Sequence, residues 1–232
     1  MDFIRLVADA GAYTQNAFTR KRARWPVFII SKYLVYPLFL GYIVEIYRGK
    51  MPSASDDPYE FIQDEPHWFS LFLNGIRLLI IKILYTMPII VTLGPILITF
   101  FFGDGDALTT MASDVYGIPE VVLITMGMLV GLFIFLYTFI IGINLPIGLI
   151  RFSRTGSMRE AFRFGAIIGD IGKIGRLRYI FSTLFIITGI GVIEYAMAQV
   201  PIIGWLLIII LSPVIAVFSA RYFTLVYDSI PG

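Results

Sequence analysis

Residues 83–102 read ILYTMPIIVTLGPILITFFF, twenty consecutive residues without a charged side chain. About twenty predominantly apolar residues are what one α-helix needs to cross the hydrocarbon core of a bilayer. Similar stretches lie at 121–150, 179–198 and 202–220, and a shorter one lies at 26–44. The sequence therefore predicts an all-α integral membrane protein.

The overall composition supports this class. Of 232 residues, 58% are hydrophobic and only 15% are charged, whereas soluble domains carry about 45–50% apolar and 25% charged residues. We expect one helical bundle, a single membrane domain over residues 1–232. The net charge of +2 gives no reason to expect nucleic acid as a partner. Cysteine is absent, which excludes disulfides, thiolate metal sites and cysteine nucleophiles.

The distribution of basic residues predicts the orientation in the membrane. No Lys or Arg occurs in 83–150 or in 179–220, so the loops inside these stretches should lie outside the cell, whereas residues 151–178 carry seven basic residues and should be cytoplasmic. We expect a multi-pass protein of the cell membrane with both termini in the cytoplasm. The predicted transmembrane helices are 71–102, 120–150, 179–198 and 202–226.

The segment 26–47 is ambiguous. A full span there would place the basic cluster at residues 20–24 outside, against the positive-inside rule. Lys32 and two prolines interrupt the segment, and each half is only about ten residues, the length of a re-entrant or interfacial piece. We favour a re-entrant hairpin, with a fifth transmembrane span as the alternative.

Residues 1–25 have the pattern of an amphipathic, basic N-terminal helix. Phe3, Leu6, Val7, Ala10 and Tyr13 recur at helical spacing. The basic residues that follow fit contact with anionic lipid head groups, or they act only as topology determinants. These residues are Arg20, Lys21, Arg22 and Arg24.

A second amphipathic segment, residues 157–176, is predicted to be a cytoplasmic interfacial helix. Its charged and apolar residues are expected on different faces, Arg159, Arg163, Asp170 and Lys173 on one and Ala161, Ile168 and Ile171 on another. The three cations Arg159, Arg163 and Lys173 are our candidates for head-group contact in this segment.

Two sets of glycines are predicted helix-packing positions. One is a GxxxG spacing in a span and the other is a stripe in the interfacial helix, where flexibility is the alternative explanation. They are Gly127 and Gly131, and Gly165, Gly169 and Gly172. The order of apolar piece, basic end and linker occurs twice, about 100 residues apart, which raises the hypothesis of two similar halves.

The residues that carry catalysis or metal binding are scarce. His67 is the only histidine, and the nearby Asp64 and Glu65 do not make a converging ligand set with it. The acidic loop at 103–120 lacks the later ligand of a calcium loop. There is no GxSxG and no phosphate-binding glycine loop. We expect no metal, no cofactor and no enzymatic activity.

The predicted function is therefore non-catalytic: a structural protein, an accessory subunit of a membrane complex, or a lipid-interacting protein. The alternative is a small-solute or lipid transporter, based on the prolines in the spans and the two possible halves. Polar residues near mid-membrane, Asn144 or Lys32, would serve such a transporter. A lipid-modifying enzyme would need a catalytic group that the sequence does not supply.

Several motifs resemble the archaeal membrane family known as Domain of Unknown Function 4013. They are Gly41-Tyr42-Ile43, Tyr47-Arg48-Gly49, Leu71 to Leu79 with Tyr85 and Pro88, Phe162-Arg163-Phe164-Gly165, Val200 to Trp205, and Phe218 to Tyr222. This chain has Asn74 where the family usually shows Asp. The resemblance covers roughly residues 1–229 and implies a multispanning protein of an archaeal cell membrane. It implies no activity.

Overall fold

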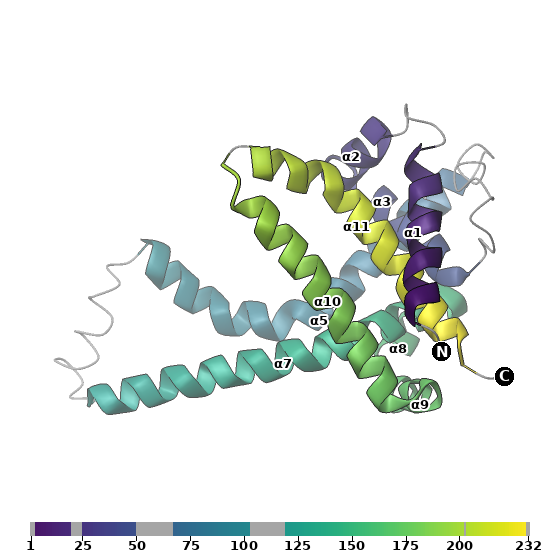
Figure 1. The fold of residues 1–232 in the computed structure, drawn as a ribbon. Helices are drawn as coiled ribbons and strands as arrows, with labels where there is room; N and C mark the ends of the chain where they lie inside the picture. Colours follow the sequence, from purple (N-terminus) through teal and green to yellow (C-terminus); the bar gives the residue numbers. More distant parts are fainter. Residues whose placement is uncertain (1–2, 20–24, 50–66, 103–118, 202, 231–232) are drawn as a thin grey trace. The chain divides into compact units, whose positions relative to one another are not determined.

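The computed structural model describes residues 3–19, 25–49, 67–102, 119–201 and 203–230. Every regular element in these ranges is a helix (Figure 1). The helices are α1 (Phe3–Thr19), α2 (Trp25–Tyr33), α3 (Tyr36–Arg48), α5 (His67–Phe102), α7 (Glu120–Thr155), α8 (Met158–Ala161), α9 (Phe164–Ile174), α10 (Arg176–Ala198) and α11 (Ile203–Asp228). Four of them, α5, α7, α10 and α11, are long and apolar enough to cross a membrane, which confirms the four predicted long helices.

The chain divides into two compact units, Lys82–Gly142 and the remainder. The smaller unit holds the C-terminal part of α5 and the N-terminal part of α7. In it the Tyr137 hydroxyl donates a hydrogen bond to the Tyr85 carbonyl at 3.1 Å. Most of the large apolar side chains of α7 in this unit are exposed, as expected for a surface that meets lipid. The single membrane domain stays a prediction.

The core of the larger unit lies where α1 and α3 pack against α11. The inner face of α1 consists of Ala10, Tyr13, Thr14, Ala17 and Phe18, all of which are buried. Of the residues predicted for the apolar face, Ala10 and Tyr13 belong to it, and the amphipathic character of this helix stays a prediction. The apolar face of the N-terminal helix is therefore covered by the last helix of the chain.

Helices α2 and α3 form a tight helical hairpin. Side chains of the two helices meet in pairs on either side of the turn at Leu34. The ring centroids of Phe28 and Tyr42 are 5.3 Å apart, and the Lys32 ammonium lies 5.7 Å from the Phe39 ring centroid. The two helices have 9 and 13 residues, about 14 and 20 Å at 1.5 Å per residue. Each is shorter than the roughly 30 Å hydrocarbon core.

Two glycines allow α3 and α5 to cross with their backbones in contact. A Cβ added to Gly41 would lie 2.0 Å from the Leu71 carbonyl oxygen, and one added to Gly75 would lie 1.7 Å from the Pro37 carbonyl oxygen. No larger residue fits such a crossing without moving a backbone. Both glycines lie in the motifs that carry the family resemblance, but we had not singled them out as packing positions.

The predicted packing glycines differ from these two. A Cβ added to any of the five predicted glycines would meet no atom within 4 Å. This holds both for Gly127 and Gly131 in the smaller unit and for the glycine stripe on α9. Within each unit they therefore make no close helix contact. Their packing role stays a prediction about a neighbouring molecule. The five positions are Gly127, Gly131, Gly165, Gly169 and Gly172.

The prediction of one continuous helix over 157–176 is wrong. The structure has two helices, α8 and α9, separated by a break at Phe162 and Arg163. The predicted faces change with it, because Asp170 lies on the buried face of α9 whereas Ile168 is exposed. The break allows acids on both short helices to turn toward the same arginine, Arg151, which a single straight helix would not present together.

Candidate functional site

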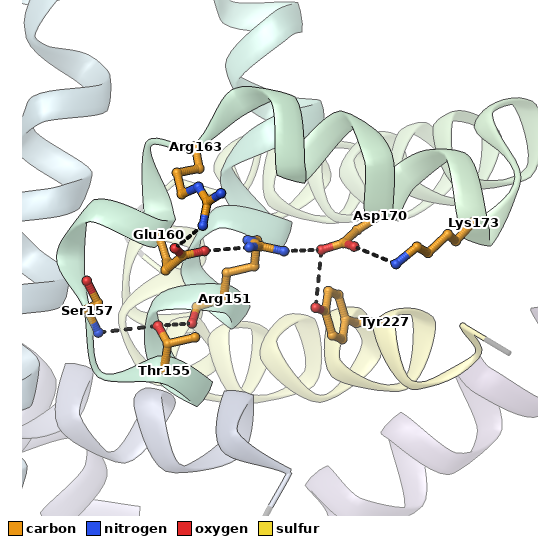
Figure 2. Close-up of polar contacts among 8 residues, drawn as sticks. All are labelled: Arg151, Thr155, Ser157, Glu160, Arg163, Asp170, Lys173 and Tyr227. Atoms are coloured by element: carbon orange, nitrogen blue, oxygen red, sulfur yellow. Dashed lines mark hydrogen bonds and ion pairs between the residues drawn. The ribbon is translucent and has the colours of Figure 1, made fainter. Parts of the chain in front are cut away.

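A cluster of charged side chains joins the short helices α8 and α9 to the end of α7 (Figure 2). Arg151, near the C-terminal end of α7, donates from one guanidinium nitrogen to Glu160 of α8 and from another to Asp170 of α9. Arg163 and Lys173 complete the set. We call these five residues the charged cluster, and residues 157–175 the elbow.

Asp170 is the central acid of the charged cluster. Besides Arg151, its carboxylate faces the Lys173 ammonium at 3.7 Å and accepts a hydrogen bond from the Tyr227 hydroxyl of α11 at 3.3 Å. Figure 2 shows Tyr227 approaching this carboxylate from the opposite side to the elbow. Asp170 therefore ties α9 to both α7 and α11, which fixes the elbow on the bundle.

Glu160 is held ionised by two arginines. Arg163 donates to its carboxylate at 2.7 Å, and Arg151 donates to its other oxygen. The hydrogen bonds from Arg163 and then Arg151 lower the pKa of the Glu160 carboxyl below its usual range. The acid therefore stays negatively charged at any neutral pH.

The turn between α7 and α8 is fixed by local hydrogen bonds. Gly156 adopts φ +71°, a left-handed conformation that favours glycine and ends α7. The Thr155 hydroxyl donates to the Arg151 carbonyl at 2.8 Å and accepts from the Ser157 amide at 3.3 Å. The turn thereby sets where α8 begins, and with it where Glu160 meets Arg151.

The acids of the elbow are buried and its cations are exposed. The side chains of Glu160 and Asp170 are only 18% and 10% exposed, whereas those of Arg163 and Lys173 are 65% and 64% exposed. Arg159 is also exposed, and no ion pair or side-chain hydrogen bond of Arg159 is found within the described ranges. The exposed charge of the elbow is therefore mainly positive, while its two acids lie beneath the cations that pair with them.

A second polar group lies where α3, α7 and α11 all end. Arg48 of α3 contacts Glu45 and the Ser153 carbonyl, and Arg154 of α7 contacts the Tyr47 carbonyl and Asp228. The Arg154 guanidinium also lies 4.7 Å from the centroid of the Tyr227 ring. Cations at helix C-termini offset the partial negative charge of the exposed carbonyls.

Two buried charges had not been identified from the sequence. Glu45 lies in the core of α3 and Arg221 in the core of α11, with the Arg221 guanidinium 5.0 Å from the Tyr13 ring centroid. One Glu45 oxygen accepts from Arg48, and the other is buried without a hydrogen-bond partner in the described part of the chain. The spacing of Glu45 and Arg48, three residues apart on an apolar helix, was the available signal.

The remaining predicted contacts can be placed only in part. Arg20, Lys21, Arg22 and Arg24 lie outside the described residues, as do Asp64 and Glu65 beside His67. Among the residues that are described, no three His, Asp or Glu side chains are grouped to hold a metal ion.

The motifs that carried the resemblance now lie in a consistent fold: the α2–α3 hairpin, the glycine crossing of α3 and α5, the elbow and α11. A family pattern, described as protein of unknown function (DUF4013), matches residues 26–224. The chain belongs to the DUF4013 family. In this DUF4013 chain the match runs from the α2–α3 hairpin through the elbow to α11, and α1 lies outside it. No curated protein and no solved structure matches the chain significantly.

Proposed function

We propose that this DUF4013 chain is a non-catalytic, multi-pass protein of the archaeal cell membrane that binds anionic lipid head groups through its elbow. In this role it acts as a structural or accessory component of the membrane. The elbow lies on the cytoplasmic side, and both termini are cytoplasmic.

The excess of exposed positive charge at the elbow carries this proposal. Arg151 shares the two buried acids Glu160 and Asp170 with Arg163 and Lys173, so that with Arg159 four cations stand against two acids and a net charge of +2 remains. The side chains of Arg163 and Lys173 are about two-thirds exposed, and Arg159 is exposed as well. Basic residues at the ends of spanning helices attract anionic lipid, by roughly 1 kcal/mol for each residue close to the surface.

The proposed orientation in the membrane rests on a neighbouring group of basic residues. The basic residues Arg48, Arg151 and Arg154 gather at the C-terminal ends of α3 and α7. By the positive-inside rule this end of the larger unit belongs in the cytoplasm. The basic residues 20–24 are proposed to add further head-group contacts.

The hairpin of α2 and α3 is proposed to enter the membrane and return. Its two limbs pair antiparallel, through Phe28 with Tyr42 and Lys32 with Phe39. Tyr33, next to the turn, shares a hydrogen bond of 2.7 Å with Ser212 in the interior of α11, whereas Arg48, at the far end, contacts Ser153 near the end of α7. These contacts support a turn that lies deep in the membrane and an end of α3 at its surface.

The lipid proposal is tested by the lipids that copurify with the protein. The triple variant Arg159→Gln, Arg163→Gln, Lys173→Gln is extracted from mixed membranes in mild detergent, and the anionic share of its bound lipid is measured by mass spectrometry. We expect a severalfold loss of anionic lipid relative to the native protein. The matched control, Arg159→Lys with Arg163→Lys, keeps the charge and should retain it. An unchanged anionic share in the triple variant would overturn the proposal.

The transporter alternative is favoured by one observation, the buried Glu45, one carboxylate oxygen of which finds no hydrogen-bond partner among the described residues. Ionisable groups buried in membrane proteins commonly mark ion or proton pathways. A role in transport predicts that Glu45→Gln abolishes proton-coupled flux in reconstituted vesicles while the protein stays folded. A structural role predicts no flux in either protein.

A further inference from the structure

Helix α9 has two apolar faces, although it lies at the end of a bundle. Its inner face, Ile167, Ile171 and Ile174, is buried. Its outer face exposes Phe164 and Ile168, which are 48% and 49% exposed, and a Cβ added to Gly165, Gly169 or Gly172 would meet no atom within 4 Å.

The outer face of α9 has few polar side chains that could form hydrogen bonds with water. Of the eleven residues of α9 only Asp170 and Lys173 are charged, and Asp170 is turned inward to Arg151 and Tyr227. A helix that faced water on its outer side would carry polar residues there, and one that is apolar all round belongs in an apolar environment.

The length and connections of α9 restrict what that environment is. Eleven residues give about 16 Å, roughly half of what a spanning helix needs. The helix is joined to the membrane-length helix α10 by the single residue Gly175 and follows the end of the membrane-length helix α7. It is therefore confined to the boundary between lipid and water.

The cations of α9 sit at the two ends of its apolar stretch. Arg163 is the residue immediately before the helix and Lys173 lies in its last turn, and both side chains are largely exposed although they pair with Glu160 and Asp170. Apolar side chains flanked by long cationic ones are typical of helices that lie in the membrane interface, with the ammonium and guanidinium groups at the phosphates.

We infer that α9 lies flat in the cytoplasmic interface with Phe164 and Ile168 inserted among the acyl chains, about 5–10 Å into the boundary between head groups and chains. The inference rests on the proposed lipid contact and adds the inserted residues and their depth. The charged cluster holds α9 on α7 and α11, so the apolar face is already presented before lipid binds. Insertion therefore does not depend on anionic lipid.

The absence of cysteine from the chain allows a direct test by site-directed spin labelling. Phe164→Cys and Ile168→Cys are each labelled with a nitroxide in phosphatidylcholine vesicles, and collision rates with oxygen and with a water-soluble nickel chelate are compared. Gln199→Cys, in the loop between α10 and α11, serves as the aqueous reference and Leu136→Cys as the acyl-chain reference, because both native side chains are exposed.

We expect an oxygen-to-nickel collision ratio at both α9 positions severalfold above that at Gln199 and approaching that at Leu136. A ratio equal to that at Gln199 would place the face in water and overturn the inference. Low collision with both reagents would show that a protein, or a second copy of this chain, covers the face, and would also overturn it. Circular dichroism confirms that each labelled variant remains helical.

Failure here is distinguishable from failure of the head-group proposal. Aqueous labels together with enrichment of anionic lipid by the native protein would remove only the insertion. Inserted labels without any such enrichment would support the insertion and remove the head-group contact.

Discussion

Arg48 and Arg154 cap each other's helices. The Arg48 Nε donates to the Ser153 carbonyl at 3.0 Å, and the Arg154 Nε donates to the Tyr47 carbonyl at 3.3 Å. Each arginine thus reaches the residue that precedes the other one. The exchange fastens the C-terminal end of α3 to that of α7 without any contact between side chains of opposite charge.

We expect Arg48→Gln and Arg154→Gln each to lower the free energy of unfolding by about 1.5–3 kcal/mol, the range for hydrogen bonds that involve a charged group. Arg48→Lys should not restore it, because lysine lacks the Nε–H that makes the bond. Unfolding in detergent measures these losses. Arg159→Gln is the control and should stay within about 0.5 kcal/mol.

The double variant tests whether the exchange acts as one unit. If the two ends of α3 and α7 separate once either bond is lost, the losses of Arg48→Gln and Arg154→Gln will be markedly less than additive. Additivity within about 0.5 kcal/mol would show that the two bonds are independent.

Gly75→Ala should disrupt the crossing of α3 and α5. The added methyl group would lie 1.7 Å from the Pro37 carbonyl oxygen, so the two backbones must separate. We expect a loss of several kcal/mol, in the upper range for single substitutions, or failure to fold. Gly169→Ala is the matched control: its Cβ meets open space, and better helix propensity should stabilise the protein by up to about 1 kcal/mol. Equal melting temperatures for the two variants would contradict the crossing.

Glu160 should make the elbow sensitive to acid. Its folded-state pKa is lowered by Arg163 and Arg151, so its contribution to stability is fully present above the unfolded pKa of about 4.3 and is lost as pH falls through the lower folded value. The melting temperature in detergent should therefore fall between about pH 5 and pH 3. Glu160→Gln should show a smaller fall over that range, and identical pH profiles would refute this role.

Cysteine labelling checks the orientation of the first helix. Ile4 is exposed on α1, and a hairpin that returns to the cytoplasm keeps α1 on the inner side. Ile4→Cys should react with an impermeant reagent only after the membrane is opened, whereas Gln199→Cys, in the loop between α10 and α11, should react in intact cells. Labelling of both from outside would instead establish a fifth span.

The long helices could be predicted from sequence because one local property, a charge-free run of sufficient length, decides them. Residues 83–102 need no knowledge of their neighbours to be assigned to a helix. The ends of the helices were predicted less accurately, since α7 continues to Thr155, past the predicted end at 150. Arg151 and Arg154 extend it because their charges are satisfied by partners elsewhere in the fold.

The candidate site could be predicted only in part, for the same reason. The outward cations Arg163 and Lys173 were identified, but Asp170 was assigned to their face. Its actual orientation depends on Arg151, nineteen residues earlier, and on Tyr227 in the last helix. Helical periodicity carries no information about such distant partners.

The hypothesis of two similar halves gains a structural argument. Helix α3 is followed by Gly49 at φ +71° and α7 by Gly156 at φ +71°. The reciprocal exchange between Arg48 and Arg154 is the contact pattern that a twofold relation produces, in which the first site touches the second as the second touches the first. The halves stay a prediction, which these endings favour.

The packing of α1 against α11 also constrains how the protein is made. Helix α1 buries Tyr13 against Arg221, which is synthesised about two hundred residues later. At 5–20 residues per second, α1 waits roughly 10–40 s for its partner. During that interval its apolar face must be shielded by lipid or by the insertion machinery. The packing of α1 therefore forms only after α11 has been made, and a chain truncated before α11 would leave α1 without the helix it packs against.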